Sequence, residues 1–421
     1  MKEKMLGLGE VKTAGTDLVK CILGILLSIV IGIVVGLYAS LFGIAIGWVT
    51  DFRLAHSWLV YLLPIGGILI VGFYRLLKIY EPGGTNRVLK SITSGEAIPI
   101  SMVPLITVST IITHFFGGSA GREGAAIQIG GSMGMQFGKL LKMDQQNIVI
   151  TTMSGMSAAF AALFGTPLTA TVFSIEVITI GIMHYSALVP CAVSSFTAYL
   201  TAKMMGLSGL SFSGVDFPTF DWLYGLKAVG FGVVCAIVGV LFILALKYAN
   251  KLYCMIANKY IRTVAGAATV ILLMLIVGNQ DYLGIGSAMI HEAVYGTVVP
   301  YAFVLKMIFT AVTLAACFKG GEIVPTIFIG ATFGCIFGPL MGIPSGAAAA
   351  MGICGVFCAV TNCPITSIFL SFELFGVAGL PMFAITAAVS YRLSGYFGLY
   401  SGQKIMYSKS LPKFINMQTR H

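Results

Sequence analysis

Charged side chains are scarce in this sequence. Only 10% of its 421 residues are Asp, Glu, Lys or Arg, whereas 57% are hydrophobic. Soluble domains carry about 25% charged residues, so this composition cannot cover the surface of a large water-soluble protein. The shortage of charge therefore excludes a soluble globular chain.

Long apolar runs stand where the charges are missing. The segments 21–50, 228–246 and 263–278 contain no charged residue. About 20 apolar residues suffice for a helix that crosses a bilayer, and lipid tolerates only segments whose backbone hydrogen bonds are satisfied internally. The 51 glycines allow such helices to pack closely. We therefore predict an all-α polytopic membrane protein.

Cysteine is also uncommon, and its placement excludes two kinds of site. Several of the nine cysteines lie inside apolar runs, among them Cys235, Cys354 and Cys358, with no His or carboxylate at ligand spacing. We therefore expect neither a disulfide framework nor a bound metal. No cofactor is expected either.

The charges that are present are mostly positive, with a formal net charge of +10. In a membrane protein this excess indicates the cytoplasmic side rather than nucleic-acid binding. Residues 1–20 mix charges of both signs before an apolar run too long for a cleavable signal. We predict a multi-pass protein of the inner (plasma) membrane with both termini cytoplasmic, from the basic residues near each end: Lys2, Lys4, Lys12, Lys20, Lys404, Lys409, Lys413 and Arg420.

The chain contains two similar halves. The segment 121–134 matches 321–334 with an offset of 200, and 166–176 matches 363–373 with an offset of 197. The two registers indicate one insertion or deletion of three residues. We divide the chain into an amino-terminal cytoplasmic segment (1–16), a first helical repeat (17–206), a linker (207–222), a second helical repeat (223–410) and a carboxy-terminal cytoplasmic tail (411–421).

Several helices are predicted to begin inside the membrane. Pro167, Pro325 and Pro364 each fall in the first turn of a predicted helix, where the missing N–H costs nothing. A helix amino end carries free N–H groups and partial positive charge, so it can bind an anion without a buried Lys or Arg. Duplicated halves of inverted topology bring such broken helices together at mid-membrane. The pattern therefore predicts an anion site between the halves.

Four carboxylates lie within apolar segments, where a charge is costly and indicates a function. Glu176 and Glu373 occupy equivalent repeat positions, which favours a structural role such as capping a neighbouring helix. Glu123 has Ile323 as its repeat partner and begins a helix, where a carboxylate can occupy an anion site when ionised and leave it when protonated. Glu322 also lacks an acidic partner, and we interpret it as a site residue or as a well-paired structural acid.

These residues carry a family resemblance. The segment 121–124, Gly-Arg-Glu-Gly, with 128–131 resembles the signature of the CLC chloride channels and antiporters, whose glutamate is the external gate. The segments 173–177 and 320–325 resemble two further family segments. Tyr400 falls at the position of the tyrosine whose hydroxyl touches the central anion, just before the family's last helix. The resemblance implies a homodimer with one pore in each subunit.

Departures from the family pattern indicate which branch of the family this sequence resembles. Thr85 stands where the family has a serine, in a first motif that has lost its proline. Val177 replaces the internal proton-transfer glutamate of chloride/proton antiporters. Glu322 and Ile323 replace an aliphatic residue and a phenylalanine, which resembles the fluoride/proton antiporter branch. Fluoride requires strong donors because it is small and strongly hydrated, and a protonated Glu322 would be one.

The sequence thus predicts proton-coupled fluoride export, with a chloride channel or chloride/proton antiporter of atypical filter as the alternative. Its partners would be the transported anion (fluoride, or chloride in the alternative), protons and the lipid bilayer. An enzyme is not expected, because His114 near Glu123 has no activated nucleophile beside it, and a scaffold is disfavoured because little of the chain lies outside the bilayer. We assign gating and proton transfer to Glu123 and anion binding to Thr85, Arg122, Gly124, Glu322, Ile323, Val324 and Tyr400.

Overall fold

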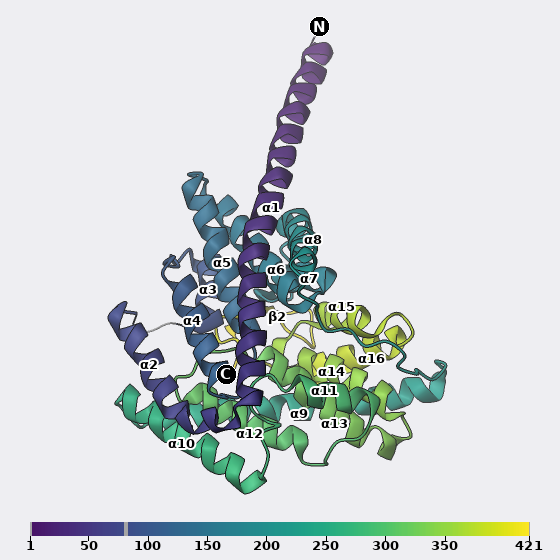
Figure 1. Cartoon of the computed structure of the whole chain (residues 1–421). Helices are drawn as coiled ribbons and strands as arrows, with labels where there is room; N and C mark the ends of the chain where they lie inside the picture. The colour runs from purple at the N-terminus through teal and green to yellow at the C-terminus, as the bar shows by residue number, and fades with distance from the viewer. Residues whose placement is uncertain (1, 80–82, 421) are drawn as a thin grey trace.

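The computed structural model describes residues 2–79 and 83–420, with side chains described for 19–79 and 83–420. The chain is a bundle of helices with a small sheet beside it (Figure 1). The elements up to residue 206 are α1 (Lys2–Ala55), η1 (Ser57–Leu62), α2 (Leu63–Leu76), α3 (Gly84–Ser94), α4 (Met102–Phe115), α5 (Glu123–Leu140), α6 (Gln145–Phe164), α7 (Pro167–Glu176), β1 (Thr179–Ile180), η2 (Tyr185–Ala187) and α8 (Leu188–Met204).

The elements after the non-helical segment 207–221 form the rest of the bundle. They are α9 (Trp222–Cys254), α10 (Lys259–Val277), α11 (Ser287–Tyr295), α12 (Ala302–Ala315), α13 (Ile323–Phe337), η3 (Pro339–Met341), α14 (Ser345–Thr361), α15 (Pro364–Phe375), α16 (Leu380–Leu393), β2 (Lys404–Tyr407) and β3 (Phe414–Gln418).

Five helical segments of the described chain are long and apolar enough to cross a membrane: 19–55, 57–76, 145–164, 222–254 and 259–277. Several other apolar helices, including α4, α12 and α13, are only 10–17 residues long. Such lengths fall below the roughly 20 residues that span a bilayer. The prediction of a polytopic helical protein with interrupted helices is therefore confirmed.

The two registers of the internal repeat reappear in the helix starts. α4 and α12 begin at Met102 and Ala302, and α5 and α13 at Glu123 and Ile323, each pair 200 residues apart. The starts of α7 and α15, Pro167 and Pro364, are 197 apart. The change of register falls in the helices between them, because α6 has 20 residues and its counterpart α14 has 17. The sequence repeat is thus a repeat of structure.

Glycines allow the paired helices of each half to touch backbone to backbone. A Cβ atom on Gly130 of α5 would collide with the carbonyl oxygen of Gly155 in α6. A Cβ atom on Gly330 of α13 would collide in the same way with Gly352 of α14. Small residues at helix crossings are how apolar helices gain packing contacts in lipid. These contacts fix α5 and α13, whose amino ends face each other.

The repeat-related carboxylates Glu176 and Glu373 cap helices of the opposite half. Glu176, at the end of α7, accepts hydrogen bonds from the backbone N–H groups of Ile365 (3.1 Å) and Thr366 (2.8 Å) at the start of α15. Glu373 accepts equivalent bonds from Leu168 (2.9 Å) and Thr169 (2.7 Å) at the start of α7. The capping role predicted for both residues is confirmed.

The expectation of a last helix after Tyr400 is wrong, because short strands follow it. β2 pairs in parallel with β1 (Thr179 with Lys404) and antiparallel with β3 (Lys404 with Gln418). The Tyr400 carbonyl oxygen accepts hydrogen bonds from the Gln403 amide (3.0 Å) and the Thr419 hydroxyl (2.6 Å), which turn the chain directly into the sheet. The partner strand β1 is distant in sequence, so a local pattern does not reveal this pairing. Strand β3 also lies within the segment predicted to be a tail.

Candidate anion and proton site

The two halves meet at a backbone contact between Gly121 and Gly321. These residues form an antiparallel bridge in which each N–H donates to the other's carbonyl oxygen, both at 2.7 Å. Flanking hydrogen bonds repeat the symmetry: the Ser119 amide donates to the Thr313 hydroxyl (3.1 Å) and the Lys319 amide to the Thr113 hydroxyl (3.1 Å). The amino ends of α5 and α13 therefore converge at one point.

Glu123 occupies the amino end of the opposite helix. Its side chain is 1% exposed, and its Oε2 accepts a hydrogen bond from the Val324 N–H at 3.3 Å. Val324 lies in the first turn of α13, where N–H groups have no partner within the helix. The carboxylate of one half thus takes a position in which the other half presents the positive end of a helix dipole.

Gly124 lies where three segments converge. A Cβ atom there would lie 3.4 Å from the Thr85 hydroxyl oxygen and 3.0 Å from both the Gly320 carbonyl oxygen and the Gly321 Cα. Thr85 is buried in the first turn of α3, which begins directly after Gly83 in the left-handed conformation. The altered first motif thus forms a helix start that carries a hydroxyl to the bridge between the halves.

Glu322 and Tyr400 complete the inner part of the site. Glu322 is half-buried at the N-cap position of α13, and Ile323 is buried behind it. Tyr400 is buried as well. The Gly402 amide donates to the Asn86 side-chain oxygen at 2.9 Å, which ties the Tyr400 segment to α3. The structure therefore brings Thr85 and Glu322 to the bridge and ties the Tyr400 segment to the start of α3.

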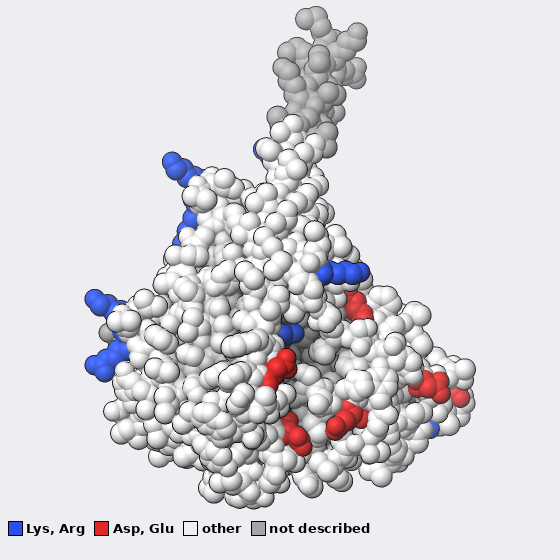
Figure 2. Space-filling view, in the orientation of Figure 1, with Lys and Arg blue, Asp and Glu red and all other residues white. Residues whose placement is uncertain are grey.

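Arg122 faces outward from this point. Its guanidinium donates to the Leu163 carbonyl oxygen at 3.1 Å, and it lines a cavity of about 200 Å³ with Glu123, Val324 and Asp51. Asp51 belongs to the end of α1 opposite its amino terminus. The face of the molecule beside the lower part of α1 is hollowed and carries acidic and basic side chains (Figure 2). Glu123 thus lines this cavity, the outer cavity, with the same side chain that contacts Val324.

Lys306 is a fully buried lysine that was not among the predicted site residues. It is 0% exposed and donates to the carbonyl oxygens of Tyr282 (3.2 Å) and Gly284 (2.8 Å) in the loop before α11. The signal was a single lysine in the apolar segment 299–317. His114, by contrast, is buried with its Nε2 3.4 Å from the Gly121 carbonyl oxygen.

Val177, which the family resemblance places at the position of the internal proton-transfer glutamate, is buried at the end of α7. Its carbonyl oxygen accepts a hydrogen bond from the Gln403 side-chain amide at 2.8 Å, and the same amide donates to the Thr361 carbonyl oxygen at 3.0 Å. Val177 therefore places no titratable side chain at this position.

Comparison with known proteins assigns the chain to one family. Residues 66–395 match the family described as "Voltage gated chloride channel", so the chain belongs to the CLC chloride channel and antiporter family. It is 33% identical over 377 residues to a "Chloride/fluoride channel protein" of Pseudomonas syringae pv. tomato, covering 87% of this chain and 83% of the relative.

Two solved structures resemble this chain in fold. The crystal structure of a CLC-type fluoride/proton antiporter aligns with a TM-score of 0.87 at 32% identity, covering 90% of this chain and 97% of that one. A slow cyanobacterial Cl⁻/H⁺ antiporter aligns with a TM-score of 0.74 at 20% identity, over 88% of this chain and 94% of that one. The second likeness concerns the fold alone.

Proposed function

We propose that this protein exports fluoride in exchange for protons, with Glu123 as both gate and proton carrier. The contact between the Glu123 carboxylate and the Val324 N–H carries the proposal, because it places a side-chain anion where a transported anion would bind. The "Chloride/fluoride channel protein" and the fluoride/proton antiporter among the similar proteins support the same anion and the same coupling.

The exchange follows from competition for one set of donors. An ionised Glu123 occupies the amino end of α13 and excludes an anion from it. When Glu123 accepts a proton from the outer cavity it loses its charge, releases the Val324 N–H and swings away. An anion from the inner side then takes its position. Glu123 then releases its proton to the inner side. The ionised carboxylate returns to its position and expels the anion outward.

Selection of fluoride is assigned to Glu322, Thr85 and Tyr400. A protonated Glu322 donates a strong O–H hydrogen bond, the Thr85 hydroxyl near Gly124 adds a second donor, and we assign a third to the buried Tyr400 hydroxyl. Such donors replace the tightly held water of fluoride, whereas chloride gains less from them. Arg122 serves the outer cavity, while Gly124, Ile323 and Val324 contribute the backbone around the bridge.

We place the protein in the inner (plasma) membrane, with both termini in the cytoplasm. Basic side chains gather on the half of the molecule near the amino-terminal end of α1, and acidic ones on the opposite half (Figure 2). This distribution supports a cytoplasmic upper side by the positive-inside rule. The outer cavity at Asp51 then opens to the exterior. We further propose a homodimer, on the strength of family membership.

Flux from purified protein in liposomes tests the function. A fluoride gradient should drive fluoride efflux together with proton uptake, and an equal chloride gradient should drive far less, as recorded with fluoride and chloride electrodes and a pH probe. Comparable fluxes of the two anions would instead establish the chloride alternative. Fluoride flux without proton movement would leave a fluoride channel.

A further inference from the structure

The outer cavity contains a carboxylate that the proposed transport cycle does not use. Its lining includes two acidic residues, Asp51 near the end of α1 and Glu123 at the start of α5. The Glu123 carboxylate accepts a hydrogen bond from the Val324 N–H. The Asp51 side chain makes no hydrogen bond or ion pair with any residue that the structure describes, and it is exposed.

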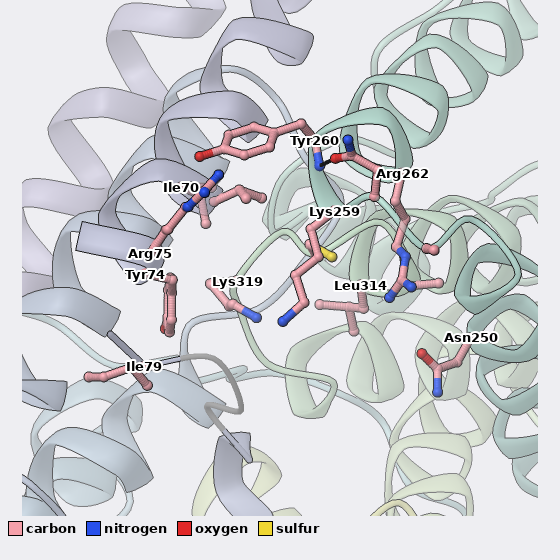
Figure 3. Close-up of a pocket in the computed structure, with 15 residues that line it drawn as sticks. Ile70, Tyr74, Arg75, Ile79, Asn250, Lys259, Tyr260, Arg262, Leu314 and Lys319 are labelled. Carbon is pink, nitrogen blue, oxygen red and sulfur yellow. Dashed lines mark hydrogen bonds between the residues drawn. The ribbon is translucent and has the colours of Figure 1, made fainter. Parts of the chain in front are cut away.

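Two other cavities differ from the outer cavity in this respect. The larger one, of about 890 Å³ between α2, α9, α10 and α12, has basic residues and no acidic residue in its described lining (Figure 3). The other, of about 320 Å³, includes Glu176, whose carboxylate already accepts the amides of Ile365 and Thr366. Among these three cavities, taken over their described linings, only the outer one has a carboxylate without a partner.

Arg122 balances the charge of Asp51 within the cavity. Together with Glu123, these are the charged residues of the described lining. The protonation state of Glu123 therefore decides the net charge of the cavity. An ionised Glu123 makes the cavity negative and attracts a proton, whereas a protonated Glu123 leaves it neutral. Asp51 thus favours proton arrival without opposing the anion when it leaves.

The charged and titratable groups of the surrounding elements do not line the cavity. Arg53 donates to a side-chain oxygen in the loop before α11 (3.3 Å), and His56 Nδ1 lies 3.0 Å from a carbonyl oxygen of its own turn. Asp281 and Glu292 are exposed and lie outside the lining. The helices α4, α6 and α8, which pack on α1, contribute no charged residue to it. Asp51 is therefore the acid that shares the cavity with Glu123.

The two carboxylates differ in which proton donors can reach them. Glu123 is 1% exposed, and the cavity of about 200 Å³ has room for a few waters, each of which occupies about 30 Å³ in the liquid. A bulky buffer molecule therefore cannot contact Glu123, whereas it can contact the exposed Asp51. Near neutral pH hydronium is far scarcer than buffer, so access to buffer determines how fast a proton arrives.

We infer that Asp51 is a proton relay between the external medium and Glu123. It takes a proton from a buffer acid, whose conjugate base stays in the medium, and water in the cavity passes the proton to the Glu123 carboxylate. Asp51 is then ionised again and ready for the next proton. Chains of carboxylates serve as proton relays in membrane transporters. The relay rests on the proposed function, since only a coupled exchanger needs a proton at Glu123 in each cycle.

Fluoride efflux from proteoliposomes tests the relay, with valinomycin to balance charge and HEPES on both sides so that protein orientation is immaterial. Wild type and Asp51→Asn should match in mildly acidic medium, where hydronium is plentiful. In mildly alkaline medium the variant should be about ten-fold slower, less than the roughly 100-fold or more of a directly reacting acid, because cavity water still delivers some protons. Raising the HEPES concentration there should speed the wild type and not the variant.

Two control variants separate the relay from general effects of charge or folding. Asp51→Glu keeps a carboxylate and should keep the wild-type pH profile, and Glu292→Gln removes an exposed acid outside the lining and should also keep it. Asp51→Asn should fold, because the side chain it replaces is exposed. An unchanged pH profile in Asp51→Asn, or equal slowing at every pH, would overturn the relay alone. A wild type that moves fluoride without protons would overturn the proposed function as well.

Discussion

Gly121 and Gly321 donate to each other's carbonyl oxygens at 2.7 Å, so the two halves of the chain join at equivalent residues. This contact sets the distance between the amino ends of α5 and α13. It also sets the reach that Glu123 needs to contact Val324. Backbone hydrogen bonds therefore set the spacing of the two helix ends, and the Glu123 side chain fits within that spacing.

Adding a methyl group at this junction should disable the site. In Gly321→Ala the new Cβ collides with the Gly124 amide nitrogen and lies 3.1 Å from that of Glu123. We expect fluoride efflux from liposomes to fall to background and Tm to drop. Gly72→Ala is the control, because a Cβ at Gly72 in α2 meets nothing within 4 Å. Normal flux in Gly321→Ala would show that the bridge tolerates displacement.

Removing the titratable group of Glu123 should abolish proton coupling. In Glu123→Gln the amide cannot carry a proton or compete as an anion, so fluoride-driven proton uptake should fall to the level of protein-free liposomes. Glu292→Gln, an exposed acid on α11, should retain full coupling. The measurement is simultaneous recording of fluoride and pH. Undiminished proton movement in Glu123→Gln would exclude Glu123 as the carrier.

Glu322 should govern anion selectivity. Glu322→Ala removes the proposed O–H donor, which we expect to lower the fluoride-to-chloride flux ratio about ten-fold or more, since hydrogen bonds to charged groups contribute about 1.5–3 kcal/mol. Glu322→Gln keeps an N–H donor and should lie between this variant and the wild type. An unchanged ratio in Glu322→Ala would assign Glu322 the alternative role of a structural acid.

The two capping glutamates should contribute about equally to stability. Glu176→Ala leaves the Ile365 and Thr366 amides without their acceptor, and Glu373→Ala does the same to Leu168 and Thr169. Each unsatisfied buried donor costs about 1–3 kcal/mol, so both variants should show a clearly lower Tm in size-exclusion assays after heating. Strongly unequal losses would contradict equivalent roles.

The sequence allowed the repeat, the helix starts and the capping acids to be predicted because each leaves a local signal. Prolines mark the starts of α7 and α15, and a carboxylate in an apolar run needs a partner. The strand at Lys404 left no such signal, since its partner Thr179 is over 200 residues away. The hydrogen bonds from Lys306 to the Tyr282 and Gly284 carbonyl oxygens could not be predicted either, because they depend on the folded path of a loop.

The crossed caps have a consequence for the order of folding in the membrane. The start of α7 is completed only by Glu373, which is synthesised about 200 residues later. Until then the amides of Leu168 and Thr169 have no protein acceptor in a solvent that supplies no water. The first half therefore cannot reach its final state ahead of the second, and a chain truncated before Glu373 would remain an unfinished insertion intermediate rather than an independent half.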